Sequence, residues 1–113
     1  YEMLWSDWSS DVCSSDLAGW GHTCATRTDN TVACWGSNIY GQLGNGIPTS
    51  TAITTPVTVT GLTNATTITA GGSHTCATRT DNTVACWGNN TSGQLGNATT
   101  TDRTTPVAVV WQR

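Results

Sequence analysis

One stretch of fifteen residues occurs twice in this chain. Residues 22–36 read HTCATRTDNTVACWG, and the same letters recur at residues 74–88, 52 positions later. Self-similarity at a period near fifty is typical of repeat proteins, in which each copy is one supersecondary unit that stacks on its neighbours to bury its apolar faces. The duplication therefore predicts a stacked architecture, whose function depends on surfaces rather than on a pocket.

The repetition continues beyond the identical core. Residues 37–45 match residues 89–97, which share the letters Gly-Gln-Leu-Gly, and the Thr-Thr-Pro-Val of residues 54–57 matches that of residues 104–107 after a deletion of two residues. Such length changes are absorbed by surface loops. We therefore expect a loop between each core and the Pro-Val segment that follows it.

Residues 1–17 do not belong to the repeat. The letters DWSSDVCSSDL of residues 7–17 resemble one reading frame of a widely used short-read sequencing adapter, and residues 1–3 (YEM) fit the indexing primer upstream of it. We interpret residues 1–17 as a translated adapter artefact and expect them to be disordered, with a genuine polar linker as the alternative. The first repeat would then begin at Ala18, truncated at its start.

Setting these residues aside changes the charge of the chain. The whole sequence has a formal net charge of −3, whereas residues 18–113 contain four arginines, three aspartates, and no lysine or glutamate. They are rich in Thr, Asn and Gly and contain neither a polybasic run nor an apolar stretch long enough to cross a bilayer. The composition favours a strand-and-turn protein and gives no support for nucleic-acid binding or membrane insertion.

The duplicated core predicts a β-hairpin. Residues 22–27 and 31–36 are rich in Thr, Val, Cys and Trp, and they flank the turn letters Thr-Asp-Asn of residues 28–30. A type I turn followed by a left-handed third residue suits these letters, because Asn tolerates positive φ. In that register Cys24 faces Cys34 at a non-hydrogen-bonded position, where a cross-strand disulfide can close.

The same register pairs Cys76 with Cys86 and selects one of the three pairings that four cysteines allow. The competing interpretation is zinc, because His22, Cys24 and Cys34 could be three ligands. Neither copy has a C-x-x-C motif or a fourth protein ligand, so disulfides are favoured, with free buried thiols as a third alternative. Disulfides predict an extracellular, periplasmic or cell-surface location. We expect neither a metal ion nor a cofactor.

Both faces of the predicted hairpin are substantially apolar. Ala25, Ala33 and Trp35 alternate with a second set that comprises His22, Cys24, Thr26, Val32 and Cys34. Each module is therefore predicted to lie between two like modules. Residues 57–60 and 66–70 would complete a four-stranded antiparallel sheet, which is the form of a propeller blade.

These motifs together resemble the repeat of the regulator of chromosome condensation family, the RCC1-like β-propellers. The resemblance rests on Gly71 with His74-Thr75, on Trp87-Gly88, on the Gly-Gln-Leu-Gly of residues 93–96 and on Pro106-Val107, each with a counterpart in the first copy. Asp81-Asn82 departs from the Asp-Gly turn that the family favours. The paired cysteines look like those of extracytoplasmic bacterial members.

The resemblance implies an all-β fold, a fragment of an RCC1-like β-propeller with about two four-stranded antiparallel blades. The first repeat would cover residues 18–56, the second residues 57–106, and residues 107–113 would form the first strand of a following blade. Family members close a ring of about seven blades. The neighbouring blades of the full-length propeller are therefore expected partners, and the isolated piece should be marginally stable and self-associating.

The function predicted is non-catalytic protein–protein interaction. No nucleophile or orienting carboxylate accompanies His22 or His74, so both histidines are interpreted as structural. The loop tips differ between the copies and are the candidate contacts for an unknown protein partner, with Tyr40 as the anchor. These candidates are Asn38, Ile39, Tyr40, Asn90, Thr91 and Ser92. The alternative suggested by the resemblance is a guanine-nucleotide exchange factor-like propeller acting on a small GTPase.

Overall fold

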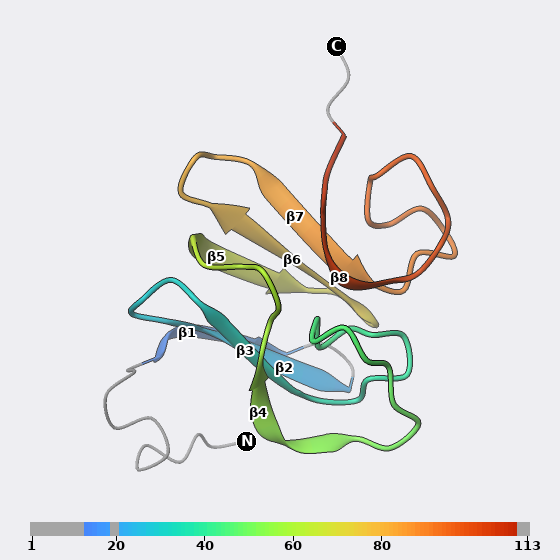
Figure 1. Cartoon of the computed structure of the whole chain (residues 1–113), viewed down its shortest axis with the longest axis horizontal. Helices are drawn as coiled ribbons and strands as arrows, with labels where there is room; N and C mark the ends of the chain where they lie inside the picture. Colours follow the sequence, from blue (N-terminus) through green and yellow to red (C-terminus); the bar gives the residue numbers. More distant parts are fainter. Residues whose placement is uncertain (1–12, 19–20, 111–113) are drawn as a thin grey trace.

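The computed structural model describes residues 13–18 and 21–110. In these residues the chain forms eight strands, arranged as two four-stranded antiparallel sheets, and contains no helix that is long and apolar enough to cross a membrane. The predicted all-β class with two propeller-like blades is confirmed. Figure 1 shows the first sheet lying below the second, so that the two sheets form two layers.

Each sheet follows the order of its strands in the chain. The first sheet consists of β1 (Cys13–Ala18), β2 (His22–Arg27), β3 (Val32–Gly36) and β4 (Ile53–Thr58). The second consists of β5 (Ala65–Ala70), β6 (His74–Arg79), β7 (Val84–Gly88) and β8 (Arg103–Ala108). The two sheets are therefore copies of one meander. The duplicated sequence accounts for the last three strands of each sheet, whereas β1 and β5 differ in sequence.

The hairpin register is the one that the sequence predicts. Cys24 lies opposite Cys34, Thr23 lies opposite Trp35, and the second hairpin repeats these pairs 52 positions later. Asn30 and Asn82 take the left-handed conformation that the turn needs, with φ of 69° and 70°. The turn is held because the amide and hydroxyl of Thr31 both donate to Asp29 Oδ1, at 3.1 and 2.6 Å. These two hydrogen bonds, the hydroxyl bond first, lower the pKa of Asp29.

Each hairpin contains one cross-strand disulfide. Cys24 is bonded to Cys34 with an S–S distance of 2.08 Å, and Cys76 to Cys86 with 2.04 Å. The Cα atoms are 4.1 and 4.0 Å apart, as expected for a non-hydrogen-bonded antiparallel pair. The pairing agrees with the one that the hairpin register selects.

The structure corrects the predicted repeat boundaries. The Thr-Thr-Pro-Val segments lie in β4 and β8, the last strands of their own sheets, and do not open the next blade. Val57 pairs with Cys34, and Val107 pairs with Cys86. Residues 107–108 therefore end the second sheet and are not the first strand of a following blade. Proline suits these positions because an edge strand leaves one row of its amides unpaired.

A second correction concerns the start of the chain. Residues 13–17, which we expected to be disordered, lie in β1 and pair with β2 in the register that β5 adopts on β6. The physical reason is that the open edge of β2 offers backbone hydrogen bonds to any extended segment, whatever its side chains. The remainder of the adapter-like segment, residues 1–12, lies outside the described residues.

The two sheets pack through unlike faces. The main core joins Cys24, Val32 and Cys34 on the inner side of the first sheet to Ala77 and Trp87 on the inner side of the second. The opposite face of the first hairpin carries a separate small cluster formed by Ala25, Ala33 and the partly buried Trp35. The face alternation therefore follows the prediction, and the disulfide side of one hairpin packs against the tryptophan side of the next.

We expect both disulfides to stabilise the fold, and the first to stabilise it more. Replacing either pair by alanines should cost roughly 2–3 kcal/mol, because the unfolded chain gains the freedom of a short closed loop. Cys24 and Cys34 are both fully buried in the main core, whereas Cys76 is partly exposed. The variant Cys24→Ala/Cys34→Ala should therefore lose about 1–2 kcal/mol more through the cavity that it leaves.

Guanidinium unfolding of the wild type and the two double variants, without reductant, measures these differences. A first-pair variant that is no less stable than the second-pair variant would contradict this account of the core.

Candidate protein-binding loops

A buried asparagine anchors the long loop that follows the hairpin in each repeat. In the first loop, residues 37–52, Asn38 is fully buried; its Oδ1 accepts from the Leu43 amide at 3.1 Å, and its Nδ2 donates to the Ile47 carbonyl at 2.7 Å. In the second loop, residues 89–102, Asn90 accepts from Leu95 at 3.0 Å and donates to Thr99 at 2.9 Å. One asparagine side chain thus hydrogen-bonds to backbone groups on both sides of each loop and holds them together.

This geometry corrects two of the predicted contact residues. Asn38 and Asn90 were grouped with the variable tips, but both side chains are fully buried and used for internal hydrogen bonds. They cannot contact a partner without dismantling their loops. Both copies carry asparagine at this place, and this identity within an otherwise variable tip was the available signal for a structural role.

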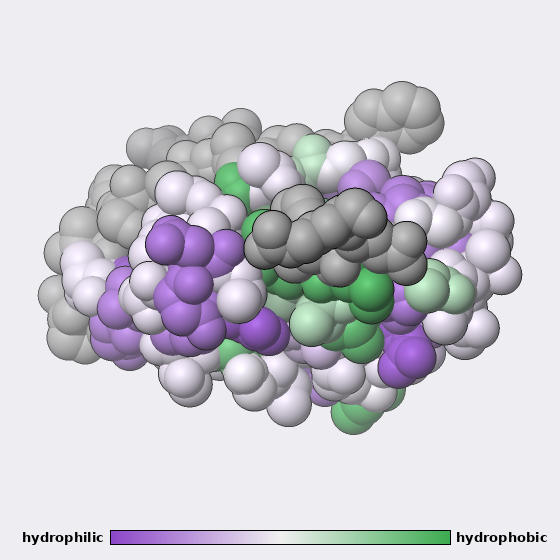
Figure 2. Space-filling model, turned by 90° about the horizontal axis from the view of Figure 1, so that it is seen from above, coloured by the Kyte–Doolittle hydropathy of each residue, from purple (hydrophilic) through white to green (hydrophobic). Residues whose placement is uncertain are grey.

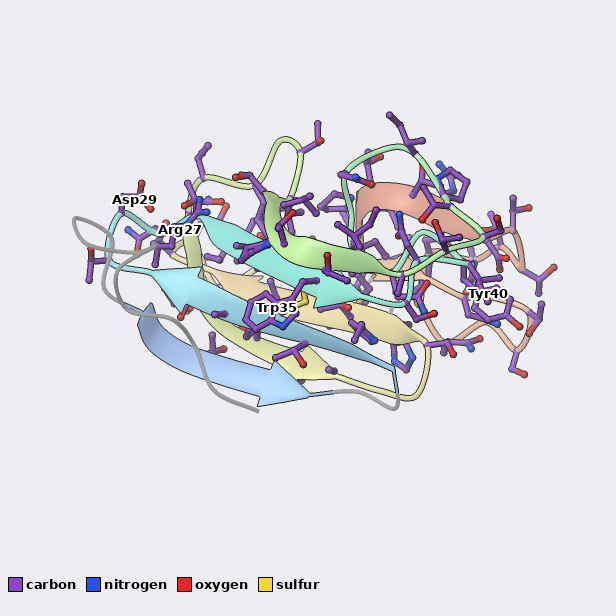
Figure 3. All side chains as sticks on the ribbon, turned by 90° about the horizontal axis from the view of Figure 1, so that it is seen from below. Arg27, Asp29, Trp35 and Tyr40 are labelled. Carbon is purple, nitrogen blue, oxygen red and sulfur yellow. A yellow bond between two sulfur atoms is a disulfide. The ribbon has the colours of Figure 1, made fainter. Side chains whose placement is uncertain are left out.

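The other predicted tip residues point to solvent. Ile39 is 59% exposed and Tyr40 is 37% exposed, while their counterparts Thr91 and Ser92 are exposed polar residues. The tip backbone is fixed because the Tyr40 amide donates to Gln42 Oε1 at 2.9 Å, a bond repeated between Ser92 and Gln94. Figure 3 places Tyr40 at the end of the molecule opposite the hairpin turn of Asp29.

A third apolar side chain on the first loop was missed by the sequence analysis. Ile47 is 64% exposed, the most exposed of the large hydrophobic residues that the structure describes. Its carbonyl accepts from Asn38 as the Thr99 carbonyl accepts from Asn90, so Ile47 and Thr99 are structural counterparts. The two copies differ here, with isoleucine at position 47 and threonine at position 99. This difference was the sequence signal that could have identified Ile47 as a candidate contact residue. The first loop is therefore apolar where the second is polar.

The first loop is also held by the second sheet. The backbone carbonyl of Gln42 accepts from Trp87 Nε1 at 2.8 Å and from the Thr75 hydroxyl at 3.1 Å. The indole lies so close to Gly44 that a Cβ added there would be 2.7 Å from Trp87 Nε1. Glycine is required at this position because any side chain would displace the indole.

A second set of contacts holds the middle of the same loop. The Gly46 amide donates to the carbonyl of Thr104 in β8 at 2.9 Å. A Cβ added at Gly41 would lie 2.7 Å from the Thr104 side chain, so the backbone packs directly on that strand. The loop is therefore held by its own asparagine and by three strands of the neighbouring sheet, β6, β7 and β8. Ile39, Tyr40 and Ile47 project from this rigid support.

His22 belongs to the joint between the two sheets, which is the hydrogen-bonded contact of His22 and Gln42 with Thr75 and Trp87. Its Nε2 lies 2.8 Å from Thr75 Oγ1, and because that hydroxyl donates to Gln42, we assign the proton to Nε2. His22 is 2% exposed, and burial, with a smaller contribution from the charge of His74, lowers its pKa to about 4. Burial alone lowers the pKa of His74. A neutral, buried histidine that donates to threonine supports the structural role.

The described residues contain no group of three His, Cys, Asp or Glu side chains placed to hold a metal ion. The zinc interpretation needed free thiolates at Cys24 and Cys34, and both sulfur atoms are committed to a disulfide. The described residues of this region offer contact surface and hydrogen-bonding groups.

A model of the regulator of chromosome condensation (RCC1) repeat matches residues 29–78 and 81–112 of the chain. The chain is 33% identical over 98 residues to the ultraviolet-B receptor UVR8 of Arabidopsis thaliana, covering 87% of this chain and 22% of that protein. It is 36% identical over 100 residues to the rat (Rattus norvegicus) protein named probable E3 ubiquitin-protein ligase HERC4, covering 86% of this chain and 9% of that protein. The chain therefore spans only a small part of these relatives.

Solved structures support the same fold. Prp20p from Saccharomyces cerevisiae superposes with a TM-score of 0.82 at 17% identity, over 90% of this chain and 26% of that one. Human WBSCR16 superposes with a TM-score of 0.76 at 24% identity, over 88% of this chain and 26% of that one. At these identities the likeness establishes the architecture of the blades and nothing further.

The buried histidine makes the stability of the fold dependent on pH. The folded pKa of His22, about 4, lies below the ordinary value of 6.5, so between these values the unfolded chain binds a proton that the folded chain does not. Stability should be full above pH 6.5 and fall by roughly 2–3 kcal/mol as the pH drops to 4. Chemical unfolding at half-unit steps of pH measures this slope.

The variant His22→Gln keeps a donor toward Thr75 but cannot titrate, so its stability should depend less steeply on pH in this window. Some slope should remain from His74, whose pKa is also lowered. Identical slopes for the variant and the wild type would show that His22 is not the group responsible.

The loops also contain a backbone position that suits glycine in one copy and is strained in the other. Gly46 has φ of 86°, and its counterpart Ala98 has φ of 67°. A left-handed conformation costs alanine about 1 kcal/mol. Ala98→Gly should therefore stabilise the fold by about 0.5 kcal/mol after the entropy cost of glycine, and Gly46→Ala should destabilise it by a similar or larger amount. Thermal unfolding of the two variants measures the change in Tm of each. Changes in Tm of the same sign would refute the explanation by the left-handed backbone conformation.

Proposed function

Because the chain belongs to the regulator of chromosome condensation (RCC1) repeat family, we propose that it is a non-catalytic protein-interaction module. The observation that carries this proposal is the exposure of Ile39, Tyr40 and Ile47 on a loop that is held by its own asparagine and by the second sheet. Exposed apolar side chains on a rigid support lose little entropy when a partner covers them, which is the property of a binding anchor. The first loop is the proposed binding element, and the polar second loop flanks it.

We further propose that the module acts outside the cytoplasm, as part of a secreted or cell-surface propeller. Two disulfides within one small unit support an oxidising compartment, because the cytosol keeps such thiols reduced. Both bonds close between neighbouring strands, and one is fully buried in the core. An extracellular or periplasmic location is consistent with this chemistry.

The partner proposed is a protein with an apolar recess able to accept an aromatic side chain. Charged residues are sparse on the loops: the second carries Asp102, whose carboxylate accepts from the Asn90 amide at 2.8 Å. Neither loop offers the cluster of arginines or lysines that a phosphate backbone requires. Because charged residues are sparse on both loops, no specific observation in this chain favours regulation of a GTPase over general protein binding.

A loop variant tests the proposal. The triple variant Ile39→Ser/Tyr40→Ser/Ile47→Ser should retain the fold, because all three side chains are exposed. Immobilised wild-type protein should retain one or more proteins from an extracellular or periplasmic fraction that the triple variant does not. For an isolated partner, Tyr40→Ser alone should weaken binding about tenfold or more, the loss typical of an aromatic anchor.

The matched control is Thr91→Ser/Ser92→Thr, which changes the equivalent tip of the second loop while keeping it polar. It should bind as the wild type does. Equal retention of the same proteins by the wild type and the triple variant, with the fold verified by circular dichroism, would refute the assignment of the first loop as the binding element.

A further inference from the structure

The first loop contains a dipeptide, Asn45-Gly46, that occurs nowhere else in the chain. Asparagine before glycine is chemically labile, because the glycine amide nitrogen can attack the asparagine side-chain carbonyl carbon and no Cβ obstructs the attack. Every other asparagine of the chain precedes alanine, asparagine or a β-branched residue. The equivalent dipeptide of the second loop is Asn97-Ala98, so the two copies form a natural pair with and without the glycine.

The local turn presents the asparagine side chain for this attack in both copies. Asn45 Oδ1 accepts from the Ile47 amide at 3.3 Å, and Asn97 Oδ1 accepts from the Thr99 amide at 3.2 Å. A turn of this kind folds the side chain back over the peptide bond that follows it. The donating amide also stabilises the negative charge that develops on Oδ1 when Cγ is attacked, as a donor in an oxyanion hole does. The turn therefore favours attack by the next amide nitrogen on Cγ.

Solvent has access to the groups that would react. Asn45 is partly exposed and Gly46 is exposed, and Asn45 Nδ2 has no hydrogen-bond partner among the residues that the structure describes. A Cβ added at Gly46 would meet one described atom within 4 Å, in the Thr105 side chain at 3.7 Å. Figure 2 shows mainly hydrophilic and intermediate residues over the right-hand end of the molecule, which carries the two loops in Figure 1. Water and hydroxide can therefore reach this dipeptide.

One contact restrains the attacking nitrogen in the first loop. The Gly46 amide donates to the Thr104 carbonyl in β8 at 2.9 Å, whereas the Ala98 amide has no hydrogen-bond partner in the described part of the chain. An amide nitrogen must lose its proton before it can attack a carbonyl carbon. The proton of Gly46 is held against the Thr104 oxygen, so hydroxide can remove it only when the loop separates from β8.

We propose that Asn45 is a site of spontaneous deamidation through a cyclic imide, and that the contact of the first loop with β8 controls its rate. Base removes the Gly46 amide proton, the nitrogen bonds to Asn45 Cγ, and the bond from Cγ to Nδ2 breaks as Nδ2 takes up a proton and leaves as ammonia. Water then adds to one of the two imide carbonyl carbons and breaks the bond of that carbon to the Gly46 nitrogen. Opening at the main-chain carbonyl leaves isoaspartate, and opening at Cγ leaves aspartate.

Isoaspartate at this position would change the shape of the first loop as well as its charge. It adds a methylene group to the main chain and places a carboxylate two residues before Ile47. Asn38 holds the two ends of the lengthened segment, because its Oδ1 accepts from the Leu43 amide and its Nδ2 donates to the Ile47 carbonyl. The longer segment cannot keep both bonds and the Gly46 bond in their present geometry. A consequent loss of partner binding rests on the proposed function, whereas the deamidation does not.

Peptide mass spectrometry of the folded protein, incubated at mildly alkaline pH, tests the proposal. The peptide containing Asn45 should gain the mass that accompanies the change of an amide to a carboxylate, and it should contain isoaspartate together with aspartate. Asn97 should remain unchanged over the same time. The variant Gly46→Ala should largely suppress the reaction at position 45, because the added Cβ obstructs the attack.

The variant Ala98→Gly tests the role of β8 within one molecule. It creates a second Leu-Gly-Asn-Gly sequence in the same kind of turn, without the hydrogen bond to Thr104. In the folded variant Asn97 should react roughly twofold to tenfold faster than Asn45, the factor that corresponds to one hydrogen bond. After reduction and unfolding the two sites should react at similar rates, because only the folded chain distinguishes them.

Hydrogen exchange measures the change in the loop. The Leu43 and Gly46 amides should be less protected in the isoaspartate form than in freshly prepared protein, while the amides of β2 and β3 should keep their protection. Unchanged protection of Leu43 and Gly46 would contradict the structural effect assigned to the modification.

Two further results would overturn the proposal. One is a folded wild type in which Asn45 keeps its mass while the unfolded chain is deamidated there. The other is a folded Ala98→Gly variant in which Asn97 reacts no faster than Asn45. Deamidation at Asn45 in a protein whose fresh form retains no partner would instead support this inference and count against the proposed function alone.

Discussion

The carbonyl oxygen of Gln42 determines how the two sheets stack. It accepts hydrogen bonds from the indole of Trp87 and the hydroxyl of Thr75, and all three groups are buried. A shifted packing would leave the indole N–H without a partner, at a cost of about 1–3 kcal/mol. Apolar contact alone would tolerate sliding, whereas this pair of bonds selects one position. Because Gln42 belongs to the first loop, the same bonds also fix the direction in which Tyr40 points.

The joint has a direction because its two halves are chemically different. One half presents a carbonyl and a histidine, and the other presents a threonine and a tryptophan, so two like faces could not satisfy one another. Each hairpin carries its histidine on one face and its threonine and tryptophan on the other, because side chains alternate across a strand. A neutral His22 extends the network without placing a charge between the sheets, which would be costly in a buried site. Stacking in one direction is thus a consequence of the alternation within a single hairpin.

Much of the fold follows from local chemistry that a sequence displays, and the failures have identifiable causes. The turn at Asp29-Asn30 specifies the register, and the register pairs the cysteines, because both depend on neighbouring residues only. A repeat period, however, does not indicate where a unit begins, so residues 57–60 and 107–113 were assigned to the following blade. The pairing of β1 was missed because backbone hydrogen bonds do not depend on side chains. The acceptor role of Gln42 was missed because the acceptor is its backbone carbonyl. Every residue has such a carbonyl, so the residue type gives no signal.

The two loops show how a repeat can change its surface without changing its support. Asn38 and Asn90 make the same bonds, and so do Gln42 and Gln94, while the exposed positions between them differ. A residue in the core touches its own sheet and the next one, so a substitution there disturbs two packing surfaces at once. A tip residue such as Tyr40 lies outside the core and can change at little cost to stability. The difference between an apolar first loop and a polar second loop is therefore a difference in what each can bind, carried by one common scaffold.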